Sequence, residues 1–186
     1  MGGEALYGEF VAAGPDADVL RAFVPTLHAE AFEAVLPAQA RGGSPELVEL
    51  WNTTRMEALT RYPETESVLE QWTARVPVAL VTNGASRLQR AKLAVTDLEA
   101  YFTAVIVSEE VGVGKPDPAP FEVALAQLGL RNDEVVMVGN DVDRDIAGAR
   151  NAHIRPIHVD RIGPHPPSAT TDVVADLTQL NDLLAP

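Results

Sequence analysis

Short apolar runs and helix-like stretches follow one another from Tyr62 to the end of the chain. Apolar runs without polar alternation are typical of strands that are buried on both faces of a parallel sheet. They predict strands over Val78–Val81, Ala104–Val107, Val135–Val138 and Pro156–Val159. Between these runs, apolar residues recur every three or four positions, as on the buried face of a helix. This spacing and the local capping signals predict helices over Glu64–Ala74, Ser86–Val95, the segment with Phe121, Ala124, Leu125 and Leu128, Asp145–Asn151 and Leu177–Leu184. Strands that alternate with helices indicate right-handed βαβ units and a parallel sheet.

The first 61 residues have a different pattern. They are rich in Ala, Leu and Glu and contain no clear strand-like run. Apolar residues recur at helical spacing at Leu20, Phe23, Leu27 and Ala31, and prolines interrupt the segment repeatedly. We therefore expect several short helices joined by turns. The predicted organisation is a small helical subdomain over residues 1–61 and an α/β core over residues 62–186.

Composition narrows the classes of function. The chain has 14 Lys and Arg against 27 Asp and Glu, a formal charge of -13, which opposes binding to nucleic acid or to an anionic membrane surface. It has no cysteine, which excludes a disulfide framework, a thiolate nucleophile and a cysteine-based zinc site. No apolar run approaches about 18 residues, and no secretory signal pattern is present. A cytoplasmic protein is the expectation.

Acidic residues follow the strand predicted at Val135–Val138. Asn140, Asp141, Asp143 and Asp145 lie just beyond its carboxyl end, where ligands bind in open α/β sheets. Clustered oxygen ligands suit a hard cation such as Mg²⁺, which is held by one or two carboxylates and a substrate phosphate. The alternative is an acidic turn that caps the next helix.

Two further strand-to-helix transitions carry polar residues. Thr82, Asn83 and Gly84 follow one strand and supply a hydroxyl, an amide and backbone N–H groups ahead of a helix, a ready anion site. The alternative is that Thr82 and Asn83 cap that helix. Lys115 lies between Gly114 and Pro116, so its ammonium is held by a stiff loop and can bind a phosphate. Most lysines are solvated surface residues, which is the alternative for Lys115.

Three segments that carry these residues resemble a known family. LVTNG (Leu80–Gly84), GKPDPAPFEVALAQLGL (Gly114–Leu130) and VVMVGNDVDRDIAGAR (Val135–Arg150) are similar to the second, third and fourth motifs of the haloacid dehalogenase-like (HAD) hydrolase superfamily. The most similar branch has a helical cap after the first motif and includes phosphoglycolate phosphatase-like and β-phosphoglucomutase-like enzymes. The resemblance implies a Rossmann-like parallel sheet flanked by helices, with the segment before Tyr62 as the cap.

The resemblance also implies roles for the residues at the strand ends. Thr82 would donate a hydrogen bond to the phosphoryl oxygens, with Asn83 and Gly84 lining the same site. Lys115 would neutralise the nucleophile and the transferring phosphoryl group. Asp141 and Asp145 would hold Mg²⁺.

Two positions depart from the family's fourth motif. Asn140 stands where an acid usually follows the glycine, and it can still ligate Mg²⁺ through its carbonyl oxygen, with one charge fewer. His153 stands where relatives commonly have a glycine that ends the helix, and we expect it to be a costlier helix stop.

A larger departure concerns the first motif. Family enzymes begin with an apolar strand that ends in DxDxT, where the first Asp attacks phosphorus and the second is the general acid/base. Here the DxD near the beginning of the sequence is Asp16-Ala17-Asp18, which follows Gly14-Pro15 rather than a strand-like run, and no Thr lies two residues after Asp18. The resemblance places such a strand between Val78–Val81 and Val135–Val138. A truncated reading frame, a strand supplied by another chain and rearranged pairing remain as explanations. Unpaired strand edges also give the chain a physical reason to form a homodimer.

Three functions follow from these observations. The first is Mg²⁺-dependent hydrolysis of a small phosphorylated metabolite through an aspartyl-phosphate. The second is a catalytically inactive HAD-like domain that binds a phosphorylated ligand or a partner, based on the absent DxDxT strand. The third is dehalogenation of 2-haloacids on the same scaffold, against which the carboxylates of Asp141 and Asp145 count, because a metal-free site gains nothing from them.

Overall fold

The structure is a computed structural model that describes residues 47, 50, 53, 54, 59–161, 163 and 171–184. Asp16-Ala17-Asp18 and nearly all of the predicted helical subdomain over residues 1–61 lie outside the described residues. The description therefore concerns the predicted α/β core.

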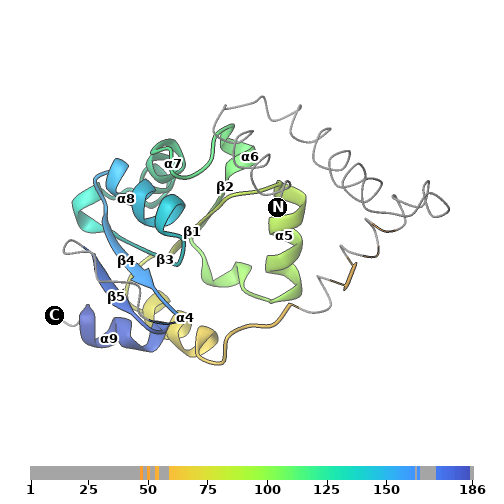
Figure 1. The fold of residues 1–186 in the computed structure, drawn as a ribbon, viewed down its shortest axis with the longest axis horizontal. Coiled ribbons are helices and arrows are strands. Elements are labelled where there is room, and N and C mark those ends of the chain that lie inside the picture. Colours follow the sequence, from red (N-terminus) through yellow and green to blue (C-terminus); the bar gives the residue numbers. More distant parts are fainter. Residues whose placement is uncertain are drawn as a thin grey trace.

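The described strands form two parallel sheets (Figure 1). In the first, β1 (Ala79–Thr82) pairs with β2 (Ala104–Val107). In the second, the order is β3 (Val136–Gly139), β4 (Arg155–Val159) and β5 (Asp172–Val174). All of these pairs are parallel, so the predicted parallel α/β class is confirmed. Each predicted strand is present within one residue of its expected bounds.

Helices connect the strands. They are α4 (Thr65–Thr73), α5 (Ser86–Val95), α6 (Ser108–Val111), α7 (Ala119–Leu128), α8 (Ala147–Asn151) and α9 (Leu180–Leu183). Single 3₁₀ turns cover Glu99–Tyr101, Asn132–Glu134 and Leu177–Gln179. Two predicted helices differ from the observed ones. The helix expected over Asp145–Asn151 begins earlier, with a π-helical turn over Val142–Ile146, and the one expected over Leu177–Leu184 is a 3₁₀ turn followed by α9.

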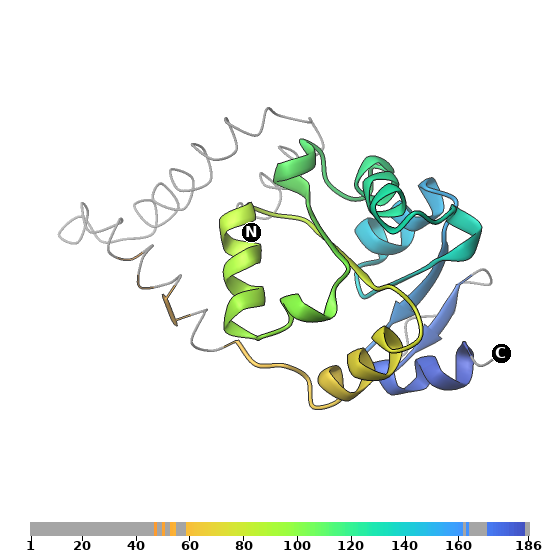
Figure 2. The ribbon, with the colours of Figure 1, turned by 180° about the vertical axis from the view of Figure 1, so that it is seen from behind.

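The sheet β3-β4-β5 is covered on both faces (Figures 1 and 2). On one face, Phe121 of α7 and Ala149 of α8 pack with Ile154 and Met137. The other face has a cluster that joins the sheet to α4 and α9, formed by Ile157, Val159, Val174 and Leu180 with Trp72, Val138, Leu177, Leu183 and Leu184. Neighbouring residues of β3 thus point to opposite faces, as the pleat of a strand requires.

Helix α7 contacts both sheets. Its Ala124 packs with Ala104 and Ile106 of β2, and Ala79 and Val81 of β1 lie against the same cluster. Its Phe121, 2% exposed, belongs to the cluster of the other sheet. Because one helix belongs to both cores, burial of its two faces fixes β1 and β3 relative to each other.

The strands β1 and β3 are not paired with each other among the described strands, although they are the neighbouring edges of the two sheets (Figures 1 and 2). Rearranged pairing that joins these two strands is therefore wrong as an explanation of the absent DxDxT strand. The segment Val135–Val138 packs on both faces as expected, through Met137 on one and Val138 on the other, but Val136 departs from the expectation, since it is 37% exposed. In contrast, Ile157 on β4, which has a neighbour on each side, is fully buried. A strand with one unpaired edge keeps part of its surface open.

The end of α8 matches the expectation for His153. Its φ is 57°, in the left-handed region that favours glycine. The His153 N–H donates to the Arg150 carbonyl, and the Ile154 N–H donates to the Ala149 carbonyl, which is the Schellman arrangement. Helix α7 ends in the same way at Gly129, with φ 67°. Two equivalent helix ends thus have a glycine, Gly129, in one case and a residue with a β-carbon, His153, in the other.

An ion pair joins the residues just before α4 to the end of β4. The Arg161 guanidinium contacts the Glu64 carboxylate and lies 3.8 Å from the centroid of the Tyr62 ring. A hydrogen bond from its own backbone and the nearby Arg161 guanidinium hold the pKa of Glu64 below its usual value, against the opposing effect of burial. The contact anchors α4 beside the sheet β3-β4-β5.

Candidate active site

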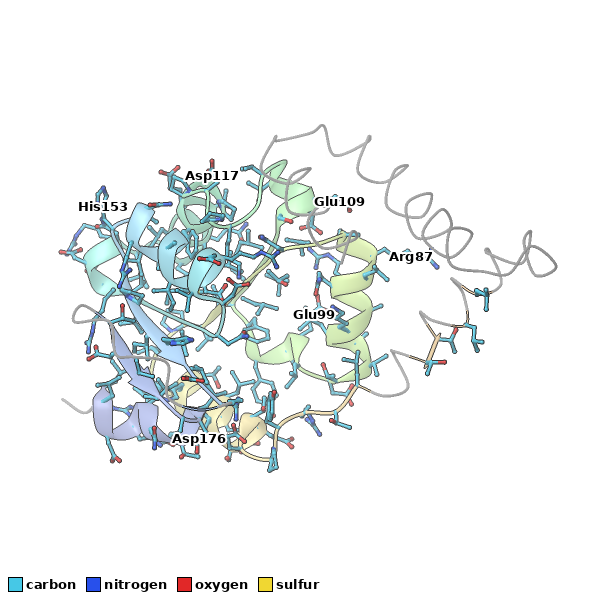
Figure 3. All side chains as sticks on the ribbon, viewed as in Figure 1. Arg87, Glu99, Glu109, Asp117, His153 and Asp176 are labelled. Atoms are coloured by element: carbon cyan, nitrogen blue, oxygen red, sulfur yellow. The ribbon has the colours of Figure 1, made fainter. Side chains whose placement is uncertain are left out.

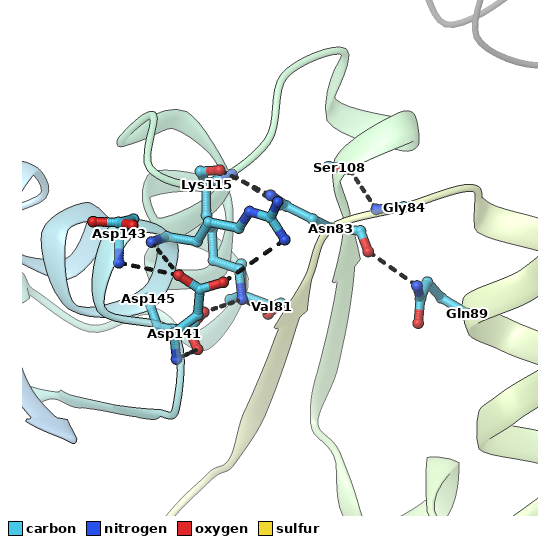
Figure 4. Close-up of polar contacts among 10 residues, drawn as sticks. Val81, Asn83, Gly84, Gln89, Ser108, Lys115, Asp141, Asp143 and Asp145 are labelled. Atoms are coloured by element: carbon cyan, nitrogen blue, oxygen red, sulfur yellow. Dashed lines mark hydrogen bonds and ion pairs between the residues drawn. The ribbon is translucent and has the colours of Figure 1, made fainter. Parts of the chain in front are cut away.

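Lys115 lies between the two sheets (Figure 4). Its Nζ donates to the Val81 carbonyl of β1 at 2.6 Å and lies 2.7 Å from Oδ1 of Asp145, which follows β3. The lysine is 8% exposed and the aspartate 7%, so this is a buried ion pair. The Val78 carbonyl faces β2, where it accepts from the Thr103 N–H. Because carbonyls alternate along a strand, that of Val81 belongs to the edge that faces away from β2. One ammonium group thus links the end of β1 to the turn after β3.

The backbone of Lys115 is held by Asn83. The Asn83 side-chain nitrogen donates to the Lys115 carbonyl, and its side-chain oxygen accepts from the Lys115 N–H, both at 2.8 Å. A β-carbon on Gly114 would lie 2.8 Å from the Asn83 side-chain oxygen, a distance that real structures do not tolerate. Glycine at position 114 therefore allows the amide to approach the loop.

The turn after β3 is organised by two carboxylates. Oδ1 of Asp141 accepts from the N–H groups of Asp143 and Arg144, at 3.0 and 2.9 Å. Asp141 is therefore the N-cap of the π-helical turn, as the capping alternative predicted. Oδ2 of Asp145 accepts from the Asp141 N–H at 3.1 Å. A β-carbon on Gly139 would lie 2.4 Å from the Asp145 carboxylate, so only glycine leaves room for it.

The residues between β1 and α5 are fixed by groups from α6. The Gly84 N–H donates to the Ser108 hydroxyl, and the Ser86 N–H donates to the Glu109 carboxylate, both at 2.9 Å. Glu109 is 5% exposed and lies beside the N-terminal end of α5 (Figure 3). The N-cap of α5 is Ala85, so the alternative that Thr82 and Asn83 cap this helix is wrong. The Glu109 carboxylate thus already accepts from the Ser86 N–H, one of the backbone donors at the expected anion site.

The donors after β3 fit a hard cation in chemistry. Asp141 and Asp145 have carboxylate oxygens, and the exposed Asn140, which precedes Asp141 in the sequence, has an amide oxygen. Each carboxylate oxygen has two lone pairs, so an oxygen that accepts one hydrogen bond can also ligate a cation. Within the described residues, no group of three or more His, Cys, Asp or Glu side chains is arranged to hold a metal by itself. A cation here would need further oxygens, from a substrate phosphate or water, as is usual for Mg²⁺.

Of the three predicted groups of polar residues, the structure brings two into direct contact, the lysine loop and the turn after β3. Lys115 contacts Asp145, and its ammonium also binds the residue before Thr82. Ser108 and Glu109 were missed in the sequence, although they follow the strand Ala104–Val107, and the rule of polar groups at carboxyl strand ends would have found them. The role of the Asn83 amide could not be found in this way, because its partner is a backbone 32 residues away.

Comparisons with known proteins identify the family of the chain. Residues 5–153 match the haloacid dehalogenase-like hydrolase family. The chain is 37% identical to phosphoserine phosphatase of Thermus thermophilus over 184 residues, which cover 95% of this chain and 72% of the relative. It is similar to the crystal structure of an HAD phosphatase from Thermococcus onnurineus, with TM-score 0.64, 30% identity, 75% of this chain and 63% of that one. It is also similar to a 2-haloacid dehalogenase from Pseudomonas syringae, with TM-score 0.71, 25% identity, 98% of this chain and 76% of that one.

The family match covers most of the chain, and the similarity to the Thermus relative extends over nearly all of it. The chain spans 63% of a pyrimidine 5'-nucleotidase of Escherichia coli and 51% of a human N-acylneuraminate-9-phosphatase, two further curated relatives. No helix in the described part of the chain combines the length and apolar character that crossing a membrane requires. The family match and the similarity to the Thermus relative show that this chain belongs to the haloacid dehalogenase-like hydrolases.

Proposed function

We propose that the site is that of a Mg²⁺-dependent phosphatase that acts on a small phosphorylated metabolite in the cytoplasm. The observation that carries the proposal is the position of the Lys115 ammonium, which lies between the end of β1 and Asp145. A buried cation at the carboxyl ends of parallel strands is placed to meet an anionic ligand. The phosphatase activities of the Thermus and Thermococcus relatives agree with a phosphoryl ligand.

Each residue has a defined task in this proposal. The Thr82 hydroxyl, at the end of β1, donates to a phosphoryl oxygen. The Lys115 ammonium offsets the negative charge on the phosphoryl group, which is worth more in a buried site than in water. Asp141 and Asp145, with Asn140, would hold Mg²⁺. When bound there, the ion would supply positive charge that stabilises the negative charge on the phosphoryl group.

Hydrolysis through an aspartyl-phosphate requires a further carboxylate as the nucleophile. Asp145 does not fit this role, because its Oδ1 is paired with Lys115 and its Oδ2 accepts from the Asp141 N–H. Asp141 does not fit it either, since its Oδ1 caps the turn that follows. The proposal therefore places the nucleophile on a residue other than these two.

A metal-dependent assay tests the proposal. Purified protein is incubated with a panel of phosphomonoesters that includes phosphoserine, phosphoglycolate and sugar phosphates, with Mg²⁺ and with EDTA. We expect phosphate release that EDTA abolishes and that Lys115→Met lowers strongly. Arg131→Ala is a matched control, because Arg131 is an exposed cation on the loop before β3 and pairs with Asp133. Hydrolysis that persists in EDTA would contradict the mechanism.

A second candidate is a domain that binds a phosphorylated ligand without turnover. The observation that favours it is that no DxDxT motif follows a strand-like run in the sequence. Calorimetry separates the two candidates, because binding of Mg²⁺ and phosphate without hydrolysis at any pH supports the second. Chloride release from 2-chloropropionate without Mg²⁺ would support dehalogenation instead, the activity named for the Pseudomonas relative. A homodimer through the edges of β1 or β3 that no described strand pairs is a further proposal, and light scattering at several concentrations tests it.

A further inference from the structure

We propose that Asn83 is a positioning residue for Lys115, which acts by holding the backbone of the lysine in the way that a neighbouring strand would. The inference rests on the proposed function only in that Lys115 is the cation that meets the phosphoryl group. The contact itself is independent of any reaction. The sequence expectation for Asn83 was contact with the phosphate, whereas its amide nitrogen and oxygen are both engaged with Lys115.

The geometry of the amide supports this role. A carboxamide has a donor and an acceptor side by side, so it can satisfy the N–H and the carbonyl of one residue at once. Both bonds measure 2.8 Å. Rotation of Lys115 about its own backbone would break at least one of them, so the pair fixes the direction in which the lysine side chain leaves the loop.

Asn83 is itself held on the opposite side. Its carbonyl accepts from the Gln89 side chain of α5 at 2.9 Å, and the next residue, Gly84, donates to Ser108. The amide is therefore fixed to β1 and α5, which are rigid elements of the scaffold. This chain of contacts fixes the backbone of the lysine loop to the first sheet, in addition to the bond between the Lys115 ammonium and Val81.

The lysine has a reason to need this support. Lys115 is the fourth residue of a loop that runs from α6 to α7, and its ammonium must reach both Val81 and Asp145. A long flexible side chain loses several rotatable bonds of freedom when it is fixed at both partners. Fixing the backbone first reduces the number of orientations from which the ammonium must find them.

The experiment compares variants that disturb this contact from its two sides. Asn83→Ala removes both hydrogen bonds. Gly114→Ala keeps Asn83 but places a β-carbon 2.8 Å from its oxygen, which forces the amide away. Asn151→Ala is the matched control, because the exposed Asn151 donates to the carbonyl of Pro116, the next residue of the same loop.

The first measurement is the acetylation rate of the Lys115 amine. The folded protein is labelled briefly, and mass spectrometry then gives the extent of acetylation at Lys115. In the wild type this amine is buried and doubly bound, so it reacts slowly. We expect Asn83→Ala and Gly114→Ala to raise the rate roughly 5- to 150-fold, the range given by two lost hydrogen bonds of ordinary strength. Asn151→Ala keeps the wild-type rate. A folded Asn83→Ala protein with the wild-type rate would overturn the proposal.

The second measurement separates this inference from the proposed function. Titration with inorganic phosphate and Mg²⁺ should show weaker binding in both site variants and none of this loss in Asn151→Ala. A wild type that neither binds phosphate nor hydrolyses phosphomonoesters refutes the proposed function, while the acetylation rates still decide the role of Asn83. Should Asn83→Ala lose its cooperative melting transition, Gly114→Ala decides by the same criteria: a raised rate supports the role, and an unchanged rate overturns it.

Discussion

The pair of Lys115 and Asp145 should dominate the response of the fold to mutation at the site. Two unit charges 2.7 Å apart attract each other by about 6 kcal/mol at an effective dielectric constant of roughly 20. Both side chains are about nine-tenths buried, so their desolvation cancels much of this attraction. Removal of one partner leaves the other charge buried without its counterion, which costs about 3–5 kcal/mol.

Three variants measure this interaction. We expect Lys115→Met and Asp145→Asn each to lower the free energy of unfolding by about 3 kcal/mol. The double variant should lose much less than the sum, because neither charge is then left alone, with a coupling energy of about 1–3 kcal/mol. Urea unfolding followed by circular dichroism gives the three values. Arg131→Ala, which removes an exposed cation that pairs with Asp133 and Glu134, should change stability by less than about 1 kcal/mol.

Additivity would refute this reasoning. If the losses in the two single variants sum to the loss in the double variant, Lys115 and Asp145 do not interact in solution. Their ion pair would then carry no share of the link between β1 and the turn after β3.

Three further variants test local features of the fold, each by chemical denaturation. His153→Gly should stabilise the protein by about 0.5–1 kcal/mol, because it removes a β-carbon at φ 57°, and Gly129→Ala should cost about 1 kcal/mol at the equivalent helix end. A loss of stability in His153→Gly, or a gain in Gly129→Ala, would contradict the assignment of these helix ends as Schellman motifs. Gly139→Ala should destabilise the protein by more than about 1 kcal/mol, as overpacking of a core does, because its β-carbon would lie 2.4 Å from Asp145. An unchanged stability would show that the Asp145 carboxylate lies elsewhere. The lowered pKa of Glu64 stabilises the fold above pH 4.5, the usual pKa of the group, and this stabilisation is lost as the pH falls through the lower pKa of the folded state. Below about pH 4.5, Glu64→Gln should therefore lose stability less steeply than the wild type. Parallel curves of stability against pH for the two proteins would refute this.

Local chemistry made much of this fold predictable. Unalternating apolar runs located β1 to β4, and glycine and proline marked the ends of the helices. The short strand β5 (Asp172–Val174) was not predicted, because it has only two apolar residues in sequence. The largest error in the core concerns the helix at Asp145, which begins three residues earlier because Asp141 caps the turn. That error was avoidable, since an Asp before a polar turn is a common N-cap.

The part that could not be predicted depends on distant contacts. Val136 is exposed because of which strands pair, and an apolar run does not specify its neighbours. The two hydrogen bonds between Asn83 and Lys115 likewise join segments 32 residues apart, so no local sequence pattern predicts them. Resemblance to the family motifs identified both residues as site residues, but only the structure shows that one holds the other.

The last prediction follows from the charges around Asp145. The Lys115 ammonium already lies 2.7 Å from its Oδ1, so a divalent cation bound to Asp145 and Asp141 would stand close to a fixed positive charge. Two neighbouring cations repel each other in a poorly solvated site. A phosphate dianion between them would offset that repulsion, because it attracts both.

Mg²⁺ and phosphate should therefore bind cooperatively to this chain. We expect saturating inorganic phosphate to tighten Mg²⁺ binding about 5- to 150-fold, and Mg²⁺ to tighten phosphate binding by the same factor, as linkage requires. Calorimetric titration of each ligand in the presence and absence of the other measures both factors. In Lys115→Met the repulsion is absent, so Mg²⁺ alone should bind more tightly than in the wild type and phosphate should help it less. Equal Mg²⁺ affinity with and without phosphate would mean that the cation does not bind beside Lys115, because no charge placed there could be indifferent to the anion.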